Sequence, residues 1–329
     1  MTFQTVTPAH SPADTLVTVF GGSGFLGRHL VRALAKRGYR IRVAVRRPEL
    51  AGFLQPLGRV GQIHAVQANL RYPASVEAAL RDAAVAVNLV GILRESGRQT
   101  FEAVQGAGAD TVGHAAAAIG ARLVHVSALG ADAQSPSAYA HTKAAGEAAA
   151  LAARPGAVIF RPSIMFGPED TFFNRFAAMA RFAPALPLIG GGETRFQPVF
   201  VGDVAAAVAD AVDGKAAPGT TYEIGGPQIR TFRELMDYML ATVGRRRLLV
   251  PVPFGLAKAA ASVLQYIPGG PLTPDQVELL RADNVVSEAA LREARTLAAF
   301  GVVPTTIEAV VPSYLWRFRK TGQFHDSLA

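Results

Sequence analysis

Residues 17–27 read Val-Thr-Val-Phe-Gly-Gly-Ser-Gly-Phe-Leu-Gly, and this stretch decides the fold. A short β-branched strand runs into closely spaced glycines, and the amphipathic segment 28–37 follows. Glycines let backbone N–H groups approach a pyrophosphate, and the next helix presents its positive N-terminal end to the same group. The order strand, glycines, helix predicts a site for a nicotinamide dinucleotide. The alternative is a tight turn without a ligand.

The composition is that of a folded protein with a large core. The chain has 329 residues, 50% of them hydrophobic and 18% charged, which suggests one large domain or one and a half. Segment 1–14 has two prolines and no apolar block, so it resembles neither a signal peptide nor a transit peptide. No stretch approaches the roughly 20 apolar residues of a membrane span. We therefore expect a cytoplasmic chain with no transmembrane segment.

The net charge and the absence of cysteine limit the ligands and partners that the chain can be expected to bind. Without cysteine there is no disulfide and no thiolate nucleophile, and the seven histidines lack ligand spacing, so no metal site is expected. The net charge of +8 suits nucleic acid, anionic lipid or an acidic protein. Because the arginines are spread along the chain without a nucleic-acid-binding motif, no nucleic acid partner is expected. A solvated basic surface remains the alternative.

The first half of the chain alternates strand-like and helix-like segments. The strand-like runs after the first are residues 41–45, 63–68, 85–90, 123–126 and 158–160. The helical patterns are residues 75–81, 101–119 and 138–153. Strands that alternate with helices predict an α/β fold, a doubly wound parallel sheet covered on both faces.

Prolines and glycines become frequent beyond about Arg161, which indicates shorter elements. We expect a flexible N-terminus at 1–14, a dinucleotide-binding Rossmann domain at 15–165 and a smaller mixed α/β lobe at 166–329. The lobe should pack above the carboxyl edge of the sheet, where open α/β folds bind ligands. The cleft between the two parts is the candidate substrate site.

The end of the second strand bears on the choice of dinucleotide. A site for NAD usually offers a carboxylate there for the ribose hydroxyls, whereas this chain has Arg46 and Arg47. Two guanidinium groups suit a 2′-phosphate, so the sequence favours NADPH over NADH. The alternative is that both arginines are solvated loop charges.

Two further strand ends are candidates for cofactor contact. Asn69 and Leu70 follow the third strand, where a short polar residue often meets the adenine. Val90 and Gly91 follow the fourth strand, and the glycine lets the backbone approach the cofactor. Either pair is equally consistent with an ordinary turn.

Tyr139 and Lys143 are spaced i and i+4 at the start of a predicted helix, so they share one face. In reductases the ammonium lowers the pKa of the tyrosine and anchors the nicotinamide ribose. The usual third partner is a hydroxyl that polarises the substrate, but only Ser127 is present, and the catalytic position falls on Ala128 or Leu129. Losing that donor costs about 3–4 kcal/mol, a rate loss of roughly 10²–10³. The pattern indicates cofactor binding with Ser127 vestigial and turnover weak or absent.

Together with the glycine cluster and Tyr-x-x-x-Lys, residues 160–168 (Phe-Arg-Pro-Ser-Ile-Met-Phe-Gly-Pro) resemble the short-chain dehydrogenases of the extended and atypical kinds. Residues 167–177, followed by 181–182 and 197–204, narrow the resemblance. The chain resembles the NADPH-binding accessory subunit of respiratory complex I, the NADH:ubiquinone oxidoreductase, and its bacterial relatives. The resemblance covers about residues 16–319 and is looser after about 227.

This resemblance implies NADPH held structurally on the peripheral arm of complex I, near the membrane, with the other subunits of that arm as partners. The family also tends to lack the third catalytic hydroxyl. The cofactor residues that it implies are Gly21, Gly22, Ser23, Gly24, Phe25, Leu26, Gly27, Arg46, Arg47, Tyr139, Lys143, Pro162 and Ile164. One alternative is an active NADP-dependent reductase, epimerase or dehydratase acting on a sugar nucleotide or a hydrophobic carbonyl compound. A third alternative is a regulator that senses the cofactor in the same pocket and controls a partner protein.

The C-terminal third offers a surface for a partner. Residues 253–266 form a mostly apolar helix candidate with Lys258 as its only charge, and residues 314–320 interleave aromatic and basic side chains. Such segments suit an anionic membrane surface or a partner's groove. A core helix and a solvated tail are the alternative. We expect a peripheral position on the inner face of the inner membrane.

Overall fold

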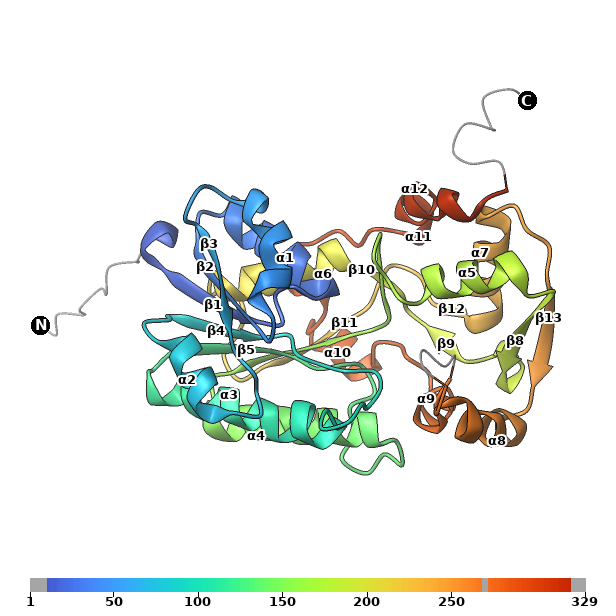
Figure 1. The fold of residues 1–329 in the computed structure, drawn as a ribbon, viewed down its shortest axis with the longest axis horizontal. Helices are drawn as coiled ribbons and strands as arrows, with labels where there is room; N and C mark the ends of the chain where they lie inside the picture. Colours follow the sequence, from blue (N-terminus) through green and yellow to red (C-terminus); the bar gives the residue numbers. More distant parts are fainter. Residues whose placement is uncertain (1–10, 268–271, 321–329) are drawn as a thin grey trace, which may run out of the picture.

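The computed structural model describes residues 11–267 and 272–320, which form two lobes side by side (Figure 1). The larger lobe is a sheet between two layers of helices, and the smaller lobe holds short strands and helices. Most of the expected flexible segment 1–14 lies outside the described residues; its end includes the short 3₁₀ helix η1 (Pro12–Asp14). No helix in the described ranges has both the length and the apolar character needed to cross a bilayer.

The large lobe is built on seven parallel strands in the order β11-β6-β5-β4-β1-β2-β3. They are β1 (Leu16–Phe20), β2 (Arg40–Val45), β3 (Ile63–Gln67), β4 (Val85–Asn88), β5 (Arg122–Val126), β6 (Val158–Pro162) and β11 (Thr221–Ile224). The predicted doubly wound α/β sheet is confirmed. The strand order reverses at β1, between β2 and β4, so a crevice is expected at the carboxyl ends of these strands.

Helices cover both faces of this sheet (Figure 1). One face carries α1 (Phe25–Lys36) and α6 (Val201–Val212); the other carries α2 (Pro73–Leu80), α3 (Ala107–Ala118) and α4 (Ala138–Ala153). Leu30 and Leu34 of α1 are fully buried against the sheet. Burying each such side chain stabilises the fold by about 1.5–3 kcal/mol. On the other face, small residues allow close packing: a Cβ atom at Gly113 would lie 3.0 Å from that of Ala153.

The chain returns to this sheet after it has entered the small lobe. Helix α6 and strand β11 fall within residues 166–329, the range expected for the small lobe, yet both belong to the large one. The large lobe also contains these irregular helices: η2 (Pro48–Leu57), the π-helical turn η3 (Glu102–Gly106) and η5 (Leu297–Phe300).

An aromatic cluster forms the core of the small lobe. Phe172 contacts Phe173 and Phe176 with ring centroids 5.2 and 5.4 Å apart, and Phe232 lies 5.4 Å from Phe176. The helices of the small lobe are α5 (Phe173–Phe182), η4 (Gly190–Gly192), α7 (Phe232–Thr242), α8 (Phe254–Leu264), α9 (Pro274–Leu279), α11 (Ile307–Val310), α12 (Pro312–Leu315) and η6 (Trp316–Phe318), and α10 (Glu288–Arg292) lies beside β11. The short strands form three pairs: β7 (Met165–Phe166) with β10 (Val199–Phe200), β9 (Arg195–Phe196) with β12 (Arg230–Thr231), and β8 (Ala185–Ile189) with β13 (Leu248–Val252).

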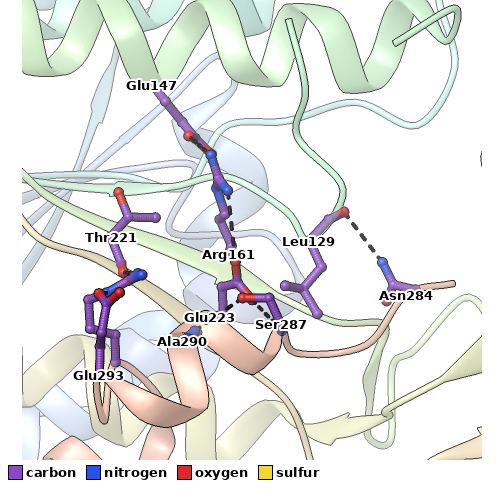
Figure 2. A network of polar contacts seen from close by, with 10 residues as sticks. Leu129, Glu147, Arg161, Thr221, Glu223, Asn284, Ser287, Ala290 and Glu293 are labelled. Atoms are coloured by element: carbon purple, nitrogen blue, oxygen red, sulfur yellow. Dashed lines mark hydrogen bonds and ion pairs between the residues drawn. The ribbon is translucent and has the colours of Figure 1, made fainter. Parts of the chain in front are cut away.

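A polar network fastens the segment around α10 to the edge of the large sheet (Figure 2). Arg161 on β6 donates two hydrogen bonds to Glu147 on α4, at 2.8 and 2.6 Å, and lies 3.9 Å from Glu223 on β11. Glu223 in turn accepts a 2.7 Å hydrogen bond from the backbone N–H of Ser287. The Asn284 side chain donates to the Leu129 carbonyl at 3.4 Å. The network therefore fixes how the two lobes meet beside the end of β5.

Candidate nucleotide-binding site

The glycine turn between β1 and α1 forms a cradle of backbone N–H groups. Gly21 has a φ of 76°, and its carbonyl accepts a 2.9 Å hydrogen bond from the N–H of Gly24. Gly24 is the N-cap of α1, and no side chain caps the helix there. The orphan N–H groups of a first helical turn attract anions, together with the positive end of the helix dipole. The cradle thus has the form that a pyrophosphate needs.

A cleft of about 240 Å³ opens beside this turn, at the carboxyl ends of β1, β2, β3 and β4. Its lining includes eight of the residues expected from the sequence: Gly21, Ser23, Gly24, Arg46, Asn69, Leu70, Val90 and Gly91. It also includes Arg71 and Gln99, which no sequence motif indicates. The site therefore lies where the reversal of strand order places it.

Other expected residues lie outside the lining of this cleft. Gly22 and Gly27 pack inside the turn, where a Cβ atom at either position would meet neighbouring atoms at under 3.0 Å. Leu26 is buried in the core, Phe25 is half-buried, and Arg47 is exposed at the start of η2. These residues shape the turn, pack in the core or lie outside the cleft lining.

Asn69 and Val90 use their polar groups in local turns. The Asn69 Oδ1 atom accepts a 3.2 Å hydrogen bond from the backbone N–H of Arg71, so the side chain fixes the turn after β3. The N–H of Val90 donates to Asn88 Oδ1 at 3.1 Å. Leu70 is buried and lines the cleft. These positions form turns and also line the cleft, and their contact with a cofactor stays a prediction.

Lys143 is a buried amine beside Gly91, although Lys143 itself does not line the cleft. It lies on α4, is 5% exposed, and donates a 3.2 Å hydrogen bond from Nζ to the carbonyl of Val126. Burial lowers the pKa of Lys143 to about 8. A Cβ atom at Gly91 would lie 3.2 Å from Nζ, so the missing side chain at position 91 lets the turn after β4 pass close to the amine.

Tyr139 lies beside Lys143 and packs against Phe101. Lys143 Nζ is 6.0 Å from the centre of its ring, and Phe101 packs edge-on at 5.8 Å. Burial, and secondarily the charge of Asp275, raise the pKa of Tyr139 to about 12. In reductases the neighbouring ammonium lowers the pKa of the tyrosine, whereas here burial raises it.

Three buried polar atoms near Lys143 have no hydrogen-bond partner among the described residues: Gln105 Oε1, His125 Nε2 and Ser127 Oγ. Gln105 lies in the π-helical turn η3, a feature that often marks functional sites. Its Oε1 atom would lie 3.4 Å from a Cβ at Gly91, the same point that Lys143 approaches. Unpaired buried groups are costly, so a ligand hydroxyl is a fitting partner for them. In the sequence, Gln105 can be singled out only as the one polar side chain among residues 103–109.

The backbone after β6 is engaged within the protein. The N–H of Ser163 donates to the Ile224 carbonyl at 2.9 Å, and that of Ile164 donates to Asn284 Oδ1 at 3.1 Å. Pro162 accepts a hydrogen bond from the Leu129 N–H at 3.0 Å. The structure thus brings Pro162 and Ile164 to the β5 edge of the site, with these groups paired internally.

The cradle, the basic cleft and the buried amine fit a dinucleotide, and together with the fold they define an NAD(P)-binding protein of the Rossmann type. The chain belongs to the NAD dependent epimerase/dehydratase family, whose sequence profile matches residues 17–225. The family resemblance seen in the sequence is confirmed by its relatives.

One relative is the NADH dehydrogenase [ubiquinone] 1 alpha subcomplex subunit 9, mitochondrial, of Arabidopsis thaliana, 36% identical over 95% of this chain and 80% of the relative. A ceramide reductase of Caulobacter vibrioides is 38% identical over 59% of this chain and 60% of the relative. Among solved structures, an NADPH-dependent quinone oxidoreductase from Escherichia coli complexed with NADPH has a TM-score of 0.69 at 21% identity, covering 91% of this chain and 99% of that one.

Proposed function

We propose that this protein holds NADPH as a structural cofactor and acts as an accessory or assembly subunit of NADH:quinone oxidoreductase, complex I. The observation that carries the proposal is the similarity to a complex I subunit along 95% of the chain. In this role the first turn of α1 holds the pyrophosphate, Arg46 favours the 2′-phosphate, and Lys143 holds the nicotinamide ribose. Bound NADPH would supply a hydride donor, and no turnover is required of it.

The surroundings of Tyr139 support a role without catalysis. Asp275 of α9 accepts hydrogen bonds from the Ser137 hydroxyl at 3.1 Å and the Ala138 N–H at 2.7 Å, so the small lobe closes onto the first turn of α4. A phenol with a pKa near 12 is a poor proton donor at neutral pH. The single hydroxyl of Ser127 is buried.

The partner surface proposed is a basic end of the small lobe, made of residues 180–184, 242–248 and 316–320. Hydrogen bonds join its parts: Arg247 donates to the Ala180 carbonyl at 2.9 Å, and Arg245 donates to that of Phe318 at 3.0 Å. These segments carry no acidic residue and seven cations: Arg181, Arg245, Arg246, Arg247, Arg317, Arg319 and Lys320.

Apolar side chains protrude from the same basic end. Phe182 is 83% exposed and Leu248 is 71% exposed. Cations around protruding apolar groups match the headgroups and acyl boundary of an anionic bilayer. We therefore assign this end to an anionic membrane surface, which would place the protein on the inner face of the inner membrane beside its complex I partners.

Purification of the native protein tests the main proposal. Co-purified NADPH that resists exchange, together with respiratory subunits, is the expected result. A monomer that oxidises NADPH when a carbonyl compound is added would overturn it and favour the second candidate, an active reductase, to which the similarity with the ceramide reductase points. Tyr139→Phe sharpens the distinction, because it should leave cofactor occupancy and any cellular phenotype unchanged if proton transfer has no role.

Flotation with liposomes tests the basic end separately. The protein should float with vesicles that contain anionic lipid and stay behind with neutral ones. The double variant Arg181→Gln/Arg246→Gln should bind less, whereas Arg59→Gln/Arg292→Gln removes the same charge from exposed positions elsewhere and should not. Equal loss in both double variants would contradict a localised surface.

A further inference from the structure

The loop that follows β4 is ordered and lies beside the nucleotide cleft. Gly91 and Ile92 near its start line the cleft, as does Gln99 near its end. Between them, the backbone groups of Ser96 and Gln99 exchange two hydrogen bonds of 3.0 Å, and Gly97 turns the chain at a φ of 54°. The segment that precedes this turn contacts the small lobe.

Arg94 in this loop reaches the end of α8. Its Nη2 atom donates to the backbone carbonyl of Gln265 and, at 3.1 Å, to that of Ile267. Gln265 is the C-cap of α8, and the last turn of this helix has no basic residue of its own to meet the negative end of the helix dipole. The half-buried guanidinium of Arg94 supplies that charge. The neighbouring Leu93 carbonyl accepts a 3.4 Å hydrogen bond from Gln276 of α9, so the loop is attached to both helices.

Helix α9 is also attached to the first turn of α4. The carboxylate of Asp275 accepts hydrogen bonds from the Ser137 hydroxyl at 3.1 Å and from the Ala138 N–H at 2.7 Å. The next residue along α4 is Tyr139, and the charge of Asp275 contributes to the rise of its pKa. Lys143 lies one turn further on. Helices α8 and α9 are therefore fastened beside the end of the site that holds Tyr139 and Lys143.

Apolar contacts hold α8 and α9 to each other, whereas the contacts just described with the large lobe are hydrogen bonds (Figure 1). The buried cluster between the two helices is made of small-lobe residues: Ile189, Ala257, Ala261 and Val277. Lys258 of α8 also lies 3.3 Å from Glu278 of α9. Separating apolar surfaces is costly, while water replaces a broken hydrogen bond at a small net cost. The two helices are thus built to leave the large lobe as a unit.

We propose that α8 and α9 form a cover over the end of the nucleotide site that holds Tyr139 and Lys143, that Arg94 and Asp275 are its latches, and that its opening limits nucleotide exchange. The inference rests on the proposed function in one respect, that a dinucleotide occupies this site. The latches form in the free and in the occupied protein, and both open before the nucleotide enters or leaves. Loosening a latch therefore changes the two rate constants in parallel and leaves their ratio, the Kd, nearly constant.

Stopped-flow fluorescence of NADPH with the full chain tests the cover. Arg94→Gln and Asp275→Ala should each raise the association and dissociation rate constants roughly tenfold and leave the Kd within roughly threefold of the parent value. Arg94→Lys should stay closer to the parent, because an ammonium still donates to the carbonyls at the end of α8. Lys258→Gln is the matched control: it removes a cation of α8 that pairs within the small lobe, and both rate constants should stay within roughly twofold of the parent values.

Hydrogen exchange of the nucleotide-free protein tests the same cover without a ligand. Arg94 donates to the end of α8, whereas the Ala138 N–H on α4 is held by Asp275 of α9. If the two latches open together, Arg94→Gln speeds the exchange of the Ala138 amide, and the expected increase is roughly tenfold. Lys258→Gln should leave this exchange rate unchanged.

The outcomes separate the cover from the wider proposal. Parent-like exchange of the Ala138 amide in Arg94→Gln would show that the latches do not open together, and the cover would be wrong. Parent-like NADPH rate constants in both latch variants would also overturn it, although nucleotide binding would stand. A raised Kd at the parent association rate would mark a direct contact with the nucleotide in place of a latch. A parent protein that binds no nucleotide overturns the proposed function itself.

Discussion

Gly27 packs so closely against Gly21 that a Cβ atom at position 27 would come within 3.0 Å of the Gly21 carbonyl oxygen. The first turn of α1 can approach the turn after β1 only because this position has no side chain. Gly27→Ala should therefore push the helix away from the turn and destabilise the protein by about 1–3 kcal/mol. It should also weaken nucleotide binding, because the N–H groups of the cradle move. Urea unfolding and NADPH titration measure the two effects.

Gly52→Ala is the control for that substitution. A Cβ atom at position 52, in η2, would meet nothing within 4 Å. Its stability should stay within about 0.5 kcal/mol of the parent and its NADPH affinity should not change. Parent-like NADPH binding by Gly27→Ala would show that the glycine turn is not the pyrophosphate site.

Removing Arg161 should destabilise the protein, because the buried carboxylate of Glu147 loses its partner. Glu147 is 5% exposed, and Arg161 satisfies both of its carboxylate oxygens (Figure 2). Arg161→Met leaves this carboxylate buried without its partner, at an expected cost of about 3–5 kcal/mol. The double variant Arg161→Met/Glu147→Leu removes both charges and should be more stable than Arg161→Met alone. Urea unfolding of the four proteins in this cycle gives the coupling, and strictly additive losses would show that the pair is not coupled.

The central sheet could be predicted because its signals are local. Each strand from β1 to β6 is an apolar run, and the segments between them carry helical patterns. Strand β11 was not predicted, since Thr221–Ile224 is four residues long and follows a region rich in proline and glycine. Only its pairing with β6 identifies it as a strand of the same sheet. Tertiary contact decides such short elements.

The residues of the site likewise divide into those that local sequence reveals and those that only the fold brings together. Residues 21–27 are consecutive, so their spacing reveals the turn from sequence alone. Arg71, Gln99 and Gln105 come from separate loops and a π-helical turn, and only the folded chain brings them to the cleft and to Lys143. The pKa of Tyr139 is raised by burial and by the charge of Asp275, and both depend on the whole fold and not on the Tyr-x-x-x-Lys spacing.

His125 should make the protein sensitive to acid. It is 2% exposed, its Nδ1 atom lies 3.2 Å from Asn88 Nδ2, and burial with the nearby charge of Lys143 lowers its pKa to about 3. Between pH 6.5 and about 3 the unfolded chain binds a proton at this residue that the folded chain does not. The stabilisation is therefore complete above pH 6.5 and is lost as the pH falls toward 3.

His125→Gln tests this by the slope of stability against pH. The slope between pH 5.5 and 4.5 should be smaller than that of the parent by about 1.4 kcal/mol per pH unit, whatever the cost of the substitution itself. His114→Gln, at an exposed histidine with a side chain 69% accessible, should keep the parent slope. If His125→Gln also keeps it, His125 is not held neutral in the folded protein.

Lys143 should make NADPH binding depend on pH above neutrality. Because burial lowers its pKa to about 8, the amine loses its proton as the pH rises through that value. The protonated amine can donate three hydrogen bonds and carries the charge that favours the nucleotide, so the affinity for NADPH should be roughly tenfold weaker at pH 9 than at pH 7.

Lys143→Arg keeps its charge throughout this range because a guanidinium stays protonated. The ratio of its dissociation constants at the two pH values should therefore be close to one, even if its absolute affinity is lower. An equal pH dependence in parent and Lys143→Arg would assign the effect to another group and remove Lys143 from the ribose site.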